Sequence, residues 1–272
     1  MKIHISIVDF FKAPRLIESL KALEKQSLFE FCQVTVFDNS VDDDNFIKLN
    51  EYIKNKKNIV LIRSSFNQGY TKATNLSVDF SADFVVLLNP DLILSSENCI
   101  KDSIEILQNH KNLGLLGIKQ VDDDGNVELV ARTYPSVKSQ LARRAPSFVS
   151  RFYRAERESY ECAEVNRQAS GVHIVDWVQS SFWVVKGELW RELNGVSEDF
   201  FLFMSEADFS LRAKKIGYLT ALNCNIHAIS DGVRASAGGW KAIFRSRAFR
   251  SHVSDMAIYY LKNLSTSKRT LP

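Results

Sequence analysis

The stretch FVVLLNPD, residues 84–91, holds five consecutive apolar residues and then stops at a polar turn that contains a proline. An apolar run closed by turn residues is typical of a strand that is covered on both faces of a sheet. Upstream, strand-like stretches alternate with stretches of helical spacing. The former are residues 3–8, 34–37 and 59–62, and the latter are residues 16–23, 46–53 and 73–80. This alternation predicts an α/β fold with a Rossmann-like, mostly parallel sheet flanked by helices.

The second half of the chain is less regular. Residues 136–170, which follow the turn signal Asp124–Gly125, are rich in arginine and poor in apolar runs, which indicates an insertion or a mobile segment. Regular patterns return in the strand-like stretches 175–185 and 218–222 and in the helical stretches 188–193, 206–216 and 240–263. We expect one domain over residues 1–235 and a basic, aromatic helical tail over residues 236–272.

Composition narrows the class of protein. The 272 residues carry a net charge of +3, which is ordinary for a globular chain and does not point to a nucleic-acid partner. The four cysteines form no CxxC pair, which argues against a zinc site and favours free thiols in a reducing compartment. The N-terminus alternates like a strand, and no apolar run approaches the roughly 20 residues that span a bilayer. We therefore expect a cytoplasmic protein, held at most on a membrane surface.

Polar residues follow three of the early strands, as DNS (38–40), NQGY (67–70) and NPD (89–91). Ligands of open parallel sheets bind beyond the carboxyl ends of the strands, so these segments are candidates for a ligand site. A carboxylate at Asp91 can bind Mg²⁺ or Mn²⁺ and, through the metal, a diphosphate, or it can cap its turn. Asp38 can accept a hydrogen bond from a pyrimidine base or form an Asx-turn with Asn39. Position alone leaves these alternatives open.

The segment FFLFMSEADFSLR, residues 200–212, places Glu206 and Asp208 at the expected start of a helix. The helix macrodipole favours carboxylates there, which is the structural explanation, whereas a general base beside a cleft is the functional one. Arg212 lies four residues after Asp208, so an ion pair within the helix is a ready structural role for both. A lone histidine such as His227 is more often a core or surface residue than a ligand.

Together these segments resemble the inverting family 2 glycosyltransferases of GT-A fold and, within them, the bacterial O-antigen rhamnosyltransferases. The resemblance runs from Ile3 to about Asn263 and is weakest over residues 130–170. The matching segments are VTVFDNS (34–40), NQGYTKATN (67–75), VVLLNPDLIL (85–94), VDWVQSSFWVVK (175–186), FFLFMSEADFSLR (200–212) and IHAIS around His227. NPD after an apolar strand, followed more than a hundred residues later by the FFLF segment, is a specific combination.

The resemblance implies a role for each matching residue. Asp38 would contact the nucleotide base, Asp91 would bind the metal ion, and Asp176 and Trp177 would lie beside the sugar and the acceptor. The other residues implied to bind the nucleotide sugar are Asn39, Asn67, Gly69, Asn75, Asn89, Arg212 and His227. The domain would consist of a nucleotide-binding half over about residues 1–125 and an acceptor half over about residues 126–235.

The chain departs from the family pattern on the acceptor side. Serine stands at position 180 where the family usually has glycine, and Val196–Ser197 stands where it usually has phenylalanine–aspartate. Ser205–Glu206 replaces the usual glutamate–aspartate, so the usual catalytic aspartate falls on Glu206. Neighbours two apart on a helix point about 200° apart. Of the two candidate catalytic carboxylates, we therefore expect Glu206 to be the base and Asp208 to support the helix.

The implied reaction moves a sugar from a nucleotide-sugar donor onto a lipid-linked saccharide, with inversion at C1. Mg²⁺ or Mn²⁺ would neutralise the departing nucleoside diphosphate while a carboxylate takes the proton of the acceptor hydroxyl. With dTDP-β-L-rhamnose as donor, the product would be an α-L-rhamnoside of O-antigen or another surface polysaccharide. UDP-galactofuranose or a UDP-hexose is an alternative donor, and a weakened binding protein on the same fold is an alternative function.

The tail indicates where such an enzyme would work. Its basic residues include Arg245, Arg247, Arg250, Lys262, Lys268 and Arg269, and its interleaved aromatic residues include Phe244, Phe249, Tyr259 and Tyr260. Near an anionic leaflet each basic residue contributes about 1 kcal/mol to binding. We expect peripheral binding at the inner face of the bacterial cytoplasmic membrane, with a helix packed on the core by its aromatic residues as the alternative.

Overall fold

A curled sheet forms the centre of the computed structural model, which describes residues 1–144, 151–232 and 247–267. Ten strands within these ranges join it, eight of them in the order β3-β2-β1-β4-β11-β6-β12-β5. Its first four strands in sequence are β1 (Ile3–Asp9), β2 (Cys32–Asp38), β3 (Ile59–Arg63) and β4 (Phe84–Leu88), and they pair in parallel. The parallel half of the predicted sheet is therefore confirmed.

One antiparallel strand lies inside the sheet. β11 (Phe182–Lys186) pairs antiparallel with both β4 and β6 (Leu113–Asp122), and β12 (Leu219–Ser230) pairs in parallel with β6. β6 and β12 therefore run in the same direction as β4, and they end at the same edge as β1, β2 and β4. The short strands are β5 (Ile93–Leu94), β7 (Val127–Glu128) and β9 (Val172–Val175) at the margins, with β8 (Ala131–Arg132) and β10 (Trp177–Val178) paired separately.

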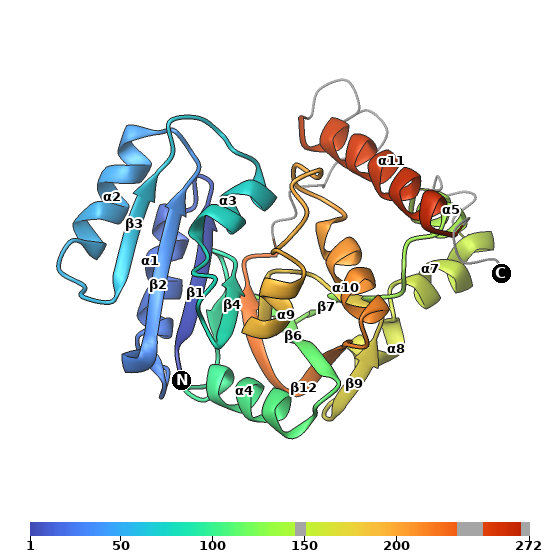
Figure 1. Ribbon diagram of the computed structural model, residues 1–272, viewed down its shortest axis with the longest axis horizontal. Helices are drawn as coiled ribbons and strands as arrows, with labels where there is room; N and C mark the ends of the chain where they lie inside the picture. Colours follow the sequence, from blue (N-terminus) through green and yellow to red (C-terminus); the bar gives the residue numbers. More distant parts are fainter. Residues whose placement is uncertain (145–150, 233–246, 268–272) are drawn as a thin grey trace.

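Helices cover both faces of the sheet (Figure 1). On one face lie α1 (Ala13–Leu23), α2 (Asp43–Ile53) and α4 (Cys99–Asn109), and on the other lie α3 (Tyr70–Ser77), α9 (Gly187–Glu192) and α10 (Ser205–Lys215). Side chains of β4 alternate between them: Val86 and Leu88 pack with the first group, Val85 and Leu87 with the second. Burial on both sides explains why this strand is apolar at every position.

Residues 136–170, expected to be an insertion or a mobile segment, contain short helices: α5 (Val137–Arg144), η2 (Arg151–Tyr153), α7 (Arg154–Tyr160) and α8 (Ala163–Asn166). The Asn166 side chain ties α8 to the domain, because its Oδ1 accepts hydrogen bonds from the backbone of Val130 and Ala131 at 3.0 and 2.9 Å. Tyr160 packs into a small apolar cluster with Phe200 and Met204. Residues 145–150 lie outside the described ranges.

The tail forms α11 (Arg247–Ser267), which lies across one end of the molecule (Figure 1). Tyr259 is buried in the cluster with Phe200 and Met204. Asp255, 2% exposed, accepts hydrogen bonds from the backbone N–H groups of residues 201, 202 and 203 at 3.1, 3.0 and 2.8 Å. The start of the expected helix and the residues Phe244, Arg245, Lys268 and Arg269 lie outside the described ranges. Within those ranges no helix is long and apolar enough to span a membrane.

Candidate active site

Acidic side chains gather where the carboxyl ends of the parallel strands meet. Asp9 ends β1 and Asp38 ends β2, opposite one another in register. Asn45 of α2 joins them, because its Nδ2 donates to Asp9 Oδ2 at 2.7 Å and to Asp38 Oδ1 at 3.1 Å. Burial raises the pKa of Asp9 to about 6, and the nearby charge of Asp38 contributes to the rise. Asp9 was not predicted as a site residue, because the candidate ligand segments follow the second, third and fourth strands.

The two carboxylate oxygens of Asp38 have different environments. Its Oδ1 accepts the backbone N–H of Ser40 at 3.1 Å, which is the Asx-turn expected from the sequence. Its Oδ2 is buried and has no hydrogen-bond partner among the described residues. A buried acceptor without a partner is costly, and a ligand N–H at this position would satisfy it. The turn and the proposed contact with a base are therefore compatible, each using a different oxygen.

Asn39, Asn67 and Gly69 come together in one loop beside Asp38. The Nδ2 of Asn39 donates to Asn67 Oδ1 at 3.1 Å and to the carbonyl oxygen of Gly69 at 3.2 Å. Gly69 has φ of 79°, and a Cβ built on it would lie 2.7 Å from the Phe201 ring. Only glycine fits there, because both the positive φ and the close contact exclude a side chain. The loop is thus held against the segment that precedes α10.

Asp91 lies beside a second carboxylate, Asp231, which follows β12. The Lys12 ammonium lies between them: its Nζ is 3.4 Å from Asp91 Oδ2 and also contacts Asp231 Oδ2. Burial and the charge of Asp231 raise the pKa of Asp91. Arg15 adds a second cation, because its Nε donates to the carbonyl oxygen of Asp91 at 3.3 Å. The sequence predicted a strand over residues 218–222, whereas β12 continues to Ser230. Asp231 therefore follows the end of a strand, and the Asp231–Gly232 turn is the sequence signal that marks this end.

The Asp91–Asp231 pair fits a divalent cation that is shared with a ligand. Two carboxylates converge on one positive charge, and carboxylate oxygens are the ligands that Mg²⁺ and Mn²⁺ prefer. In the part of the chain that the structure describes, no group of three His, Cys, Asp or Glu side chains could enclose a metal. Mg²⁺ commonly takes one or two carboxylates and completes its shell with phosphate oxygens and water. The pair therefore suits a metal bound together with a diphosphate.

Glu206, in the first turn of α10, is a carboxylate that forms no ion pair with a cation among the described residues. Its Oε1 accepts a hydrogen bond from Ser180 Oγ at 3.2 Å, and its Oε2 lies 3.4 Å from Ser205 Oγ. Burial raises its pKa. The adjoining Ser181 carbonyl accepts the backbone N–H of Asn89 at 2.8 Å, so this segment connects Glu206 to the NPD loop. The serine that departs from the family pattern thus contacts the predicted base.

Asp208 and Arg212 have a different environment from Glu206. Asp208 is 3% exposed, and its Oδ2 accepts from Arg212 Nε at 2.8 Å. The guanidinium of Arg212 also donates to the carbonyl oxygens of Leu193 and Gly195, at 2.8 and 3.1 Å. Lys262 of α11 approaches Asp208 Oδ1 at 3.7 Å. With both oxygens near cations and its partner fixed to a loop, Asp208 is suited to holding α10 in place.

Three other predicted residues lie apart from the acidic edge. The Trp177 ring is buried in the apolar cluster of Tyr160, and its Nε1 donates to the carbonyl oxygen of Thr133 at 2.7 Å. Asn75 ties α3 to a loop, because it both donates to and accepts from the backbone of Val196. His227 is exposed within β12, opposite Lys119, and is not grouped with Asp91 and Asp231. His227 and Asp231 lie only four residues apart, so the sequence does not show that His227 is inside the strand and Asp231 is at its end.

The solved structures that resemble this chain share its architecture. The mannosyltransferase PcManGT from Pyrobaculum calidifontis, in complex with GDP-Man and Mn²⁺, is 12% identical, with a TM-score of 0.62 over 97% of this chain and 64% of that one. S. aureus TarS 1-349 with UDP-GlcNAc is 16% identical, with a TM-score of 0.56 over 88% and 62%. GalNAc-T7 with UDP, GalNAc and Mn²⁺ is 11% identical, with a TM-score of 0.61 over 84% and 43%.

At these identities the likeness shows the fold alone, and this chain spans less than two thirds of the length of each of those three proteins. Among curated proteins, none matches the sequence significantly. The fold and the acidic edge define an α/β domain of the GT-A type, as the sequence predicted. The model of the family "Glycosyl transferase family 2" matches residues 6–167, which is more than half of the chain. The chain belongs to that family.

Proposed function

We propose that this protein is an inverting glycosyltransferase that takes its sugar from a nucleotide-sugar donor bound at the acidic edge of the sheet. The observation that carries this proposal is the pairing of two unlike acidic sites on one edge. Asp91 and Asp231 converge on the Lys12 ammonium, whereas Glu206 has a raised pKa and no cationic partner in the part of the chain that the structure describes. The first site suits a diphosphate with its metal, and the second suits a group that accepts a proton.

Donor binding is assigned to residues of the first half of the chain together with Asp231. The free Oδ2 of Asp38 would accept an N–H of the base, while the loop of Asn39, Asn67 and Gly69 would lie along the nucleotide. Asp91 and Asp231 would hold Mg²⁺ or Mn²⁺, which neutralises charge on the departing nucleoside diphosphate when bound. Asn89 would contact the donor from the same NPD loop.

Glu206 is proposed as the general base. Its carboxylate would take the proton of the acceptor hydroxyl as that oxygen attacks C1 from the face opposite the diphosphate, which inverts the anomeric centre. Ser180 would hold the carboxylate through its Oε1, at 3.2 Å. Asp208, already engaged by Arg212, would keep the helix in position.

The donor is proposed to be dTDP-β-L-rhamnose and the acceptor a lipid-linked saccharide of a surface polysaccharide. The segments that resemble the O-antigen rhamnosyltransferases support this choice, including NPD at 89–91 and the FFLF segment at 200–212. Pocket shape sets donor identity, so UDP-galactofuranose and the UDP-hexoses are the alternatives that an experiment must compare.

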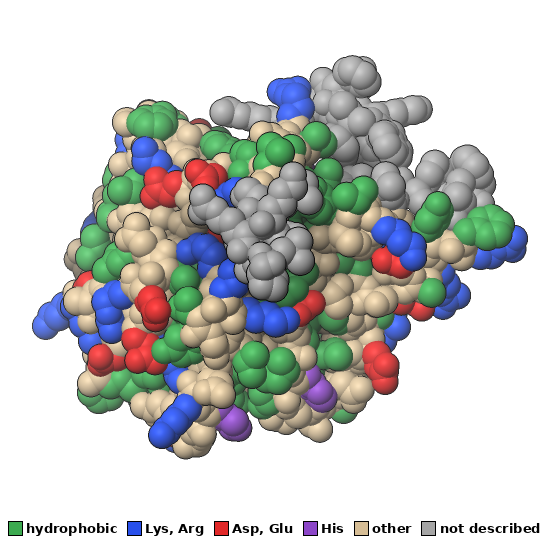
Figure 2. All heavy atoms as spheres, turned by 45° about the vertical axis from the view of Figure 1, so that its right-hand side comes forward, with side chains coloured by type: hydrophobic (Ala, Val, Ile, Leu, Met, Phe, Trp, Pro, Cys, Tyr) green, Lys and Arg blue, Asp and Glu red, His purple; other side chains and the backbone are tan. Residues whose placement is uncertain are grey.

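Peripheral attachment to an anionic membrane is proposed through the end of the molecule that carries α5, η2 and α11. Exposed apolar side chains there include Phe152, Leu261 and Val137, at 76%, 70% and 62% exposure. Figure 2 shows hydrophobic and basic side chains next to each other at the right-hand end. Part of the tail serves packing instead, because Tyr259 is buried and Lys262 pairs with Asp199 at 2.7 Å. Salt-sensitive binding to anionic rather than neutral liposomes would support the attachment.

A donor screen tests the proposed activity. Release of nucleoside diphosphate from dTDP-β-L-rhamnose, UDP-galactofuranose and UDP-hexoses is measured with Mn²⁺, Mg²⁺ or EDTA. We expect one donor to be used well above the others and the Asp91→Asn variant to be inactive while folded. Release that is the same in EDTA and in Asp91→Asn as in the metal-loaded wild type would contradict the metal site. No release from any donor would contradict the activity.

A further inference from the structure

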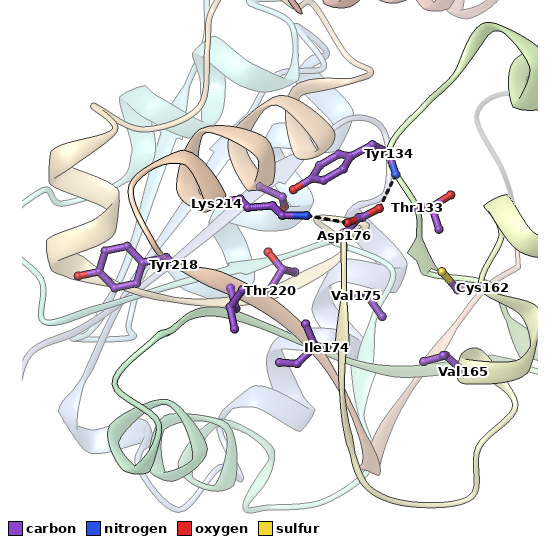
Figure 3. A pocket seen from close by; sticks show the side chains of 12 residues that line it. Thr133, Tyr134, Cys162, Val165, Ile174, Val175, Asp176, Lys214, Tyr218 and Thr220 are labelled. Atoms are coloured by element: carbon purple, nitrogen blue, oxygen red, sulfur yellow. Dashed lines mark hydrogen bonds and ion pairs between the residues drawn. The ribbon is translucent and has the colours of Figure 1, made fainter. Parts of the chain in front are cut away.

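A hollow lies between the C-terminal half of α10, the β9 strand and the beginning of β12 (Figure 3). Its volume is about 270 Å³. Leu219 and Thr220 line it at the start of β12, whereas Asp231 follows the end of that strand. At about 3.3 Å per residue, roughly 36 Å of extended strand separates Thr220 from Asp231. The hollow therefore lies apart from the Asp91–Asp231 pair, and the proposed function does not use it.

An ion pair forms the polar wall of this pocket. Lys214 Nζ lies 3.4 Å from Asp176 Oδ1, and the backbone N–H of Tyr134 donates to Asp176 Oδ2 at 3.0 Å. The Lys214 ammonium also lies 5.2 Å from the centre of the Tyr134 ring, over its face. Figure 3 shows these three side chains converging above Thr220. The opposite charges balance, so this wall offers donors and acceptors without favouring an anion or a cation.

Two buried hydroxyl groups in the lining lack partners. Ser210 on α10 and Thr220 on β12 are 1% and 4% exposed, and both line the pocket. Neither Ser210 Oγ nor Thr220 Oγ1 has a hydrogen-bond partner among the described residues. Such groups are costly unless something else satisfies them. A ligand that carries its own hydroxyl groups would do so.

The remaining walls are apolar. Tyr218, Ile174 and Val165 face the pocket beside the polar groups. A pocket of this volume falls just below the range of about 300–1,000 Å³ for drug-sized ligands, so it suits a single ring rather than a nucleotide. The pocket thus combines aromatic and aliphatic walls with two hydroxyl groups and an ion pair. These features match a neutral ring that has hydroxyl groups on its edge and C–H groups on its faces.

We propose that this pocket binds one pyranose unit of a saccharide, at a position distinct from the donor site. Asp176 and Lys214 would bond to ring hydroxyls, and Ser210 and Thr220 would gain the partners they lack. Ser210 lies one turn after Glu206 on α10, so the pocket is rigidly joined to the helix that carries the proposed base. The resemblance expected Asp176 beside the sugar and the acceptor. In this pocket Asp176 would contact a sugar that lies outside the reacting centre.

Saturation-transfer NMR with simple methyl glycosides tests the proposal on the purified full chain. The probes are methyl α-L-rhamnoside, methyl α-D-glucoside and methyl β-D-galactoside, each at millimolar concentration. We expect ring protons of at least one probe to receive saturation from the wild-type protein. The signal should fall at least fivefold in Thr220→Val and in Lys214→Met. Thr220→Val removes only a hydroxyl without a partner, so it should fold as the wild type does.

The matched control is Asp91→Asn, which alters the acidic edge and leaves the pocket untouched. Its signal should equal that of the wild type, and saturating UDP with Mn²⁺ should not displace the glycoside. The proposal is overturned if no probe binds, if Thr220→Val and Lys214→Met bind as well as the wild type, or if Asp91→Asn alone abolishes binding. Because nucleotide binding is not required, failure of this test is distinct from failure of the proposed transferase activity.

Discussion

At the scale of single residues, Glu206 is the side chain on which the chemistry most depends. The Glu206→Gln variant keeps the shape of the side chain and its contact with Ser180 but removes the proton acceptor. We expect kcat to fall by about 10²- to 10⁴-fold while the donor dissociation constant stays the same. Because burial raises the pKa of Glu206, wild-type kcat should decrease on acidification at a pH above the ordinary glutamate value of 4.5. Steady-state kinetics across pH and donor titration provide the measurement.

The control for this variant is Glu192→Gln, an exposed position on α9. It should leave kcat unchanged. The account would be wrong about the base if Glu206→Gln kept near-normal kcat while a folded Asp208→Asn variant were inactive.

Lys12 makes a second prediction at this scale. Its ammonium lies between Asp91 and Asp231, where it repels a divalent cation and competes for the same oxygens. The Lys12→Met variant should therefore bind Mn²⁺ about tenfold more tightly, as measured by electron paramagnetic resonance titration of free Mn²⁺. Lys21→Met, an exposed lysine on α1, is the control. Unchanged or weaker Mn²⁺ binding in Lys12→Met would show that the carboxylate pair is not a metal site.

The sequence predicted part of this site for a physical reason. Strand ends in a parallel sheet meet at one edge, so Asp38, Asn39 and Asp91 could be grouped from their positions alone. Lys12 and Asp231 could not be grouped in the same way, because 219 positions separate them and only the completed sheet brings them together. The burial of Trp177 could not be predicted either, because its position in a motif does not show whether its indole ring packs into the core.

At the scale of elements, α11 fixes the segment between the loop of Asn39, Asn67 and Gly69 and the proposed base, Glu206. Asp255 accepts three backbone N–H groups from residues 201–203. The carbonyl oxygen of Phe201 in turn accepts the N–H of Tyr70, which begins α3. Each hydrogen bond to a charged group contributes about 1.5–3 kcal/mol. Replacing Asp255 by Asn should lower the free energy of unfolding by about 2–4 kcal/mol and expose these amides to hydrogen exchange.

Chemical denaturation and hydrogen exchange measured by mass spectrometry would test this prediction. Ser254→Ala, at an exposed position one residue away, should change neither. If Asp255→Asn were as stable and as protected as the wild type, α11 would be an appendage rather than a support of the site.

The elements predicted from the sequence are those whose pattern is set locally. The continuous apolar run of β4 and the alternation of early strands and helices identified the parallel half. β6 was not predicted, because Gly114 and Gly117 weaken its strand pattern. Both glycines are there for packing: a Cβ would lie 2.5 Å from Leu189 at position 114 and 2.9 Å from Val178 at position 117. That reason lies in tertiary contacts, which no local pattern reveals.

At the scale of the whole molecule, the buried Asp9 makes stability depend on pH. Burial raises its pKa from 3.8 to about 6 in the folded state, so folding favours the protonated carboxyl. This contribution is fully present below pH 3.8 and is lost as the pH rises through about 6. Asp9→Asn should remove that slope, so the difference in unfolding free energy between the two proteins should change by up to about 3 kcal/mol across this window.

Urea denaturation at several pH values between 4 and 7.5 measures that difference. Parallel stability curves for wild type and Asp9→Asn would show that the carboxyl titrates in the folded protein as it does in the unfolded chain.

A nucleotide is proposed to bind at the edge formed by Asp38 and Asp91. Isothermal titration calorimetry with dTDP, UDP and GDP in the presence of Mn²⁺ tests it without knowledge of the acceptor. We expect one of these nucleotides to bind the wild type and Glu206→Gln equally. We also expect binding to weaken at least tenfold in Asp38→Asn and in Asp91→Asn, both checked for an unchanged thermal midpoint. Absence of binding by all three nucleotides, or equal binding to the two edge variants and the wild type, would contradict the proposal.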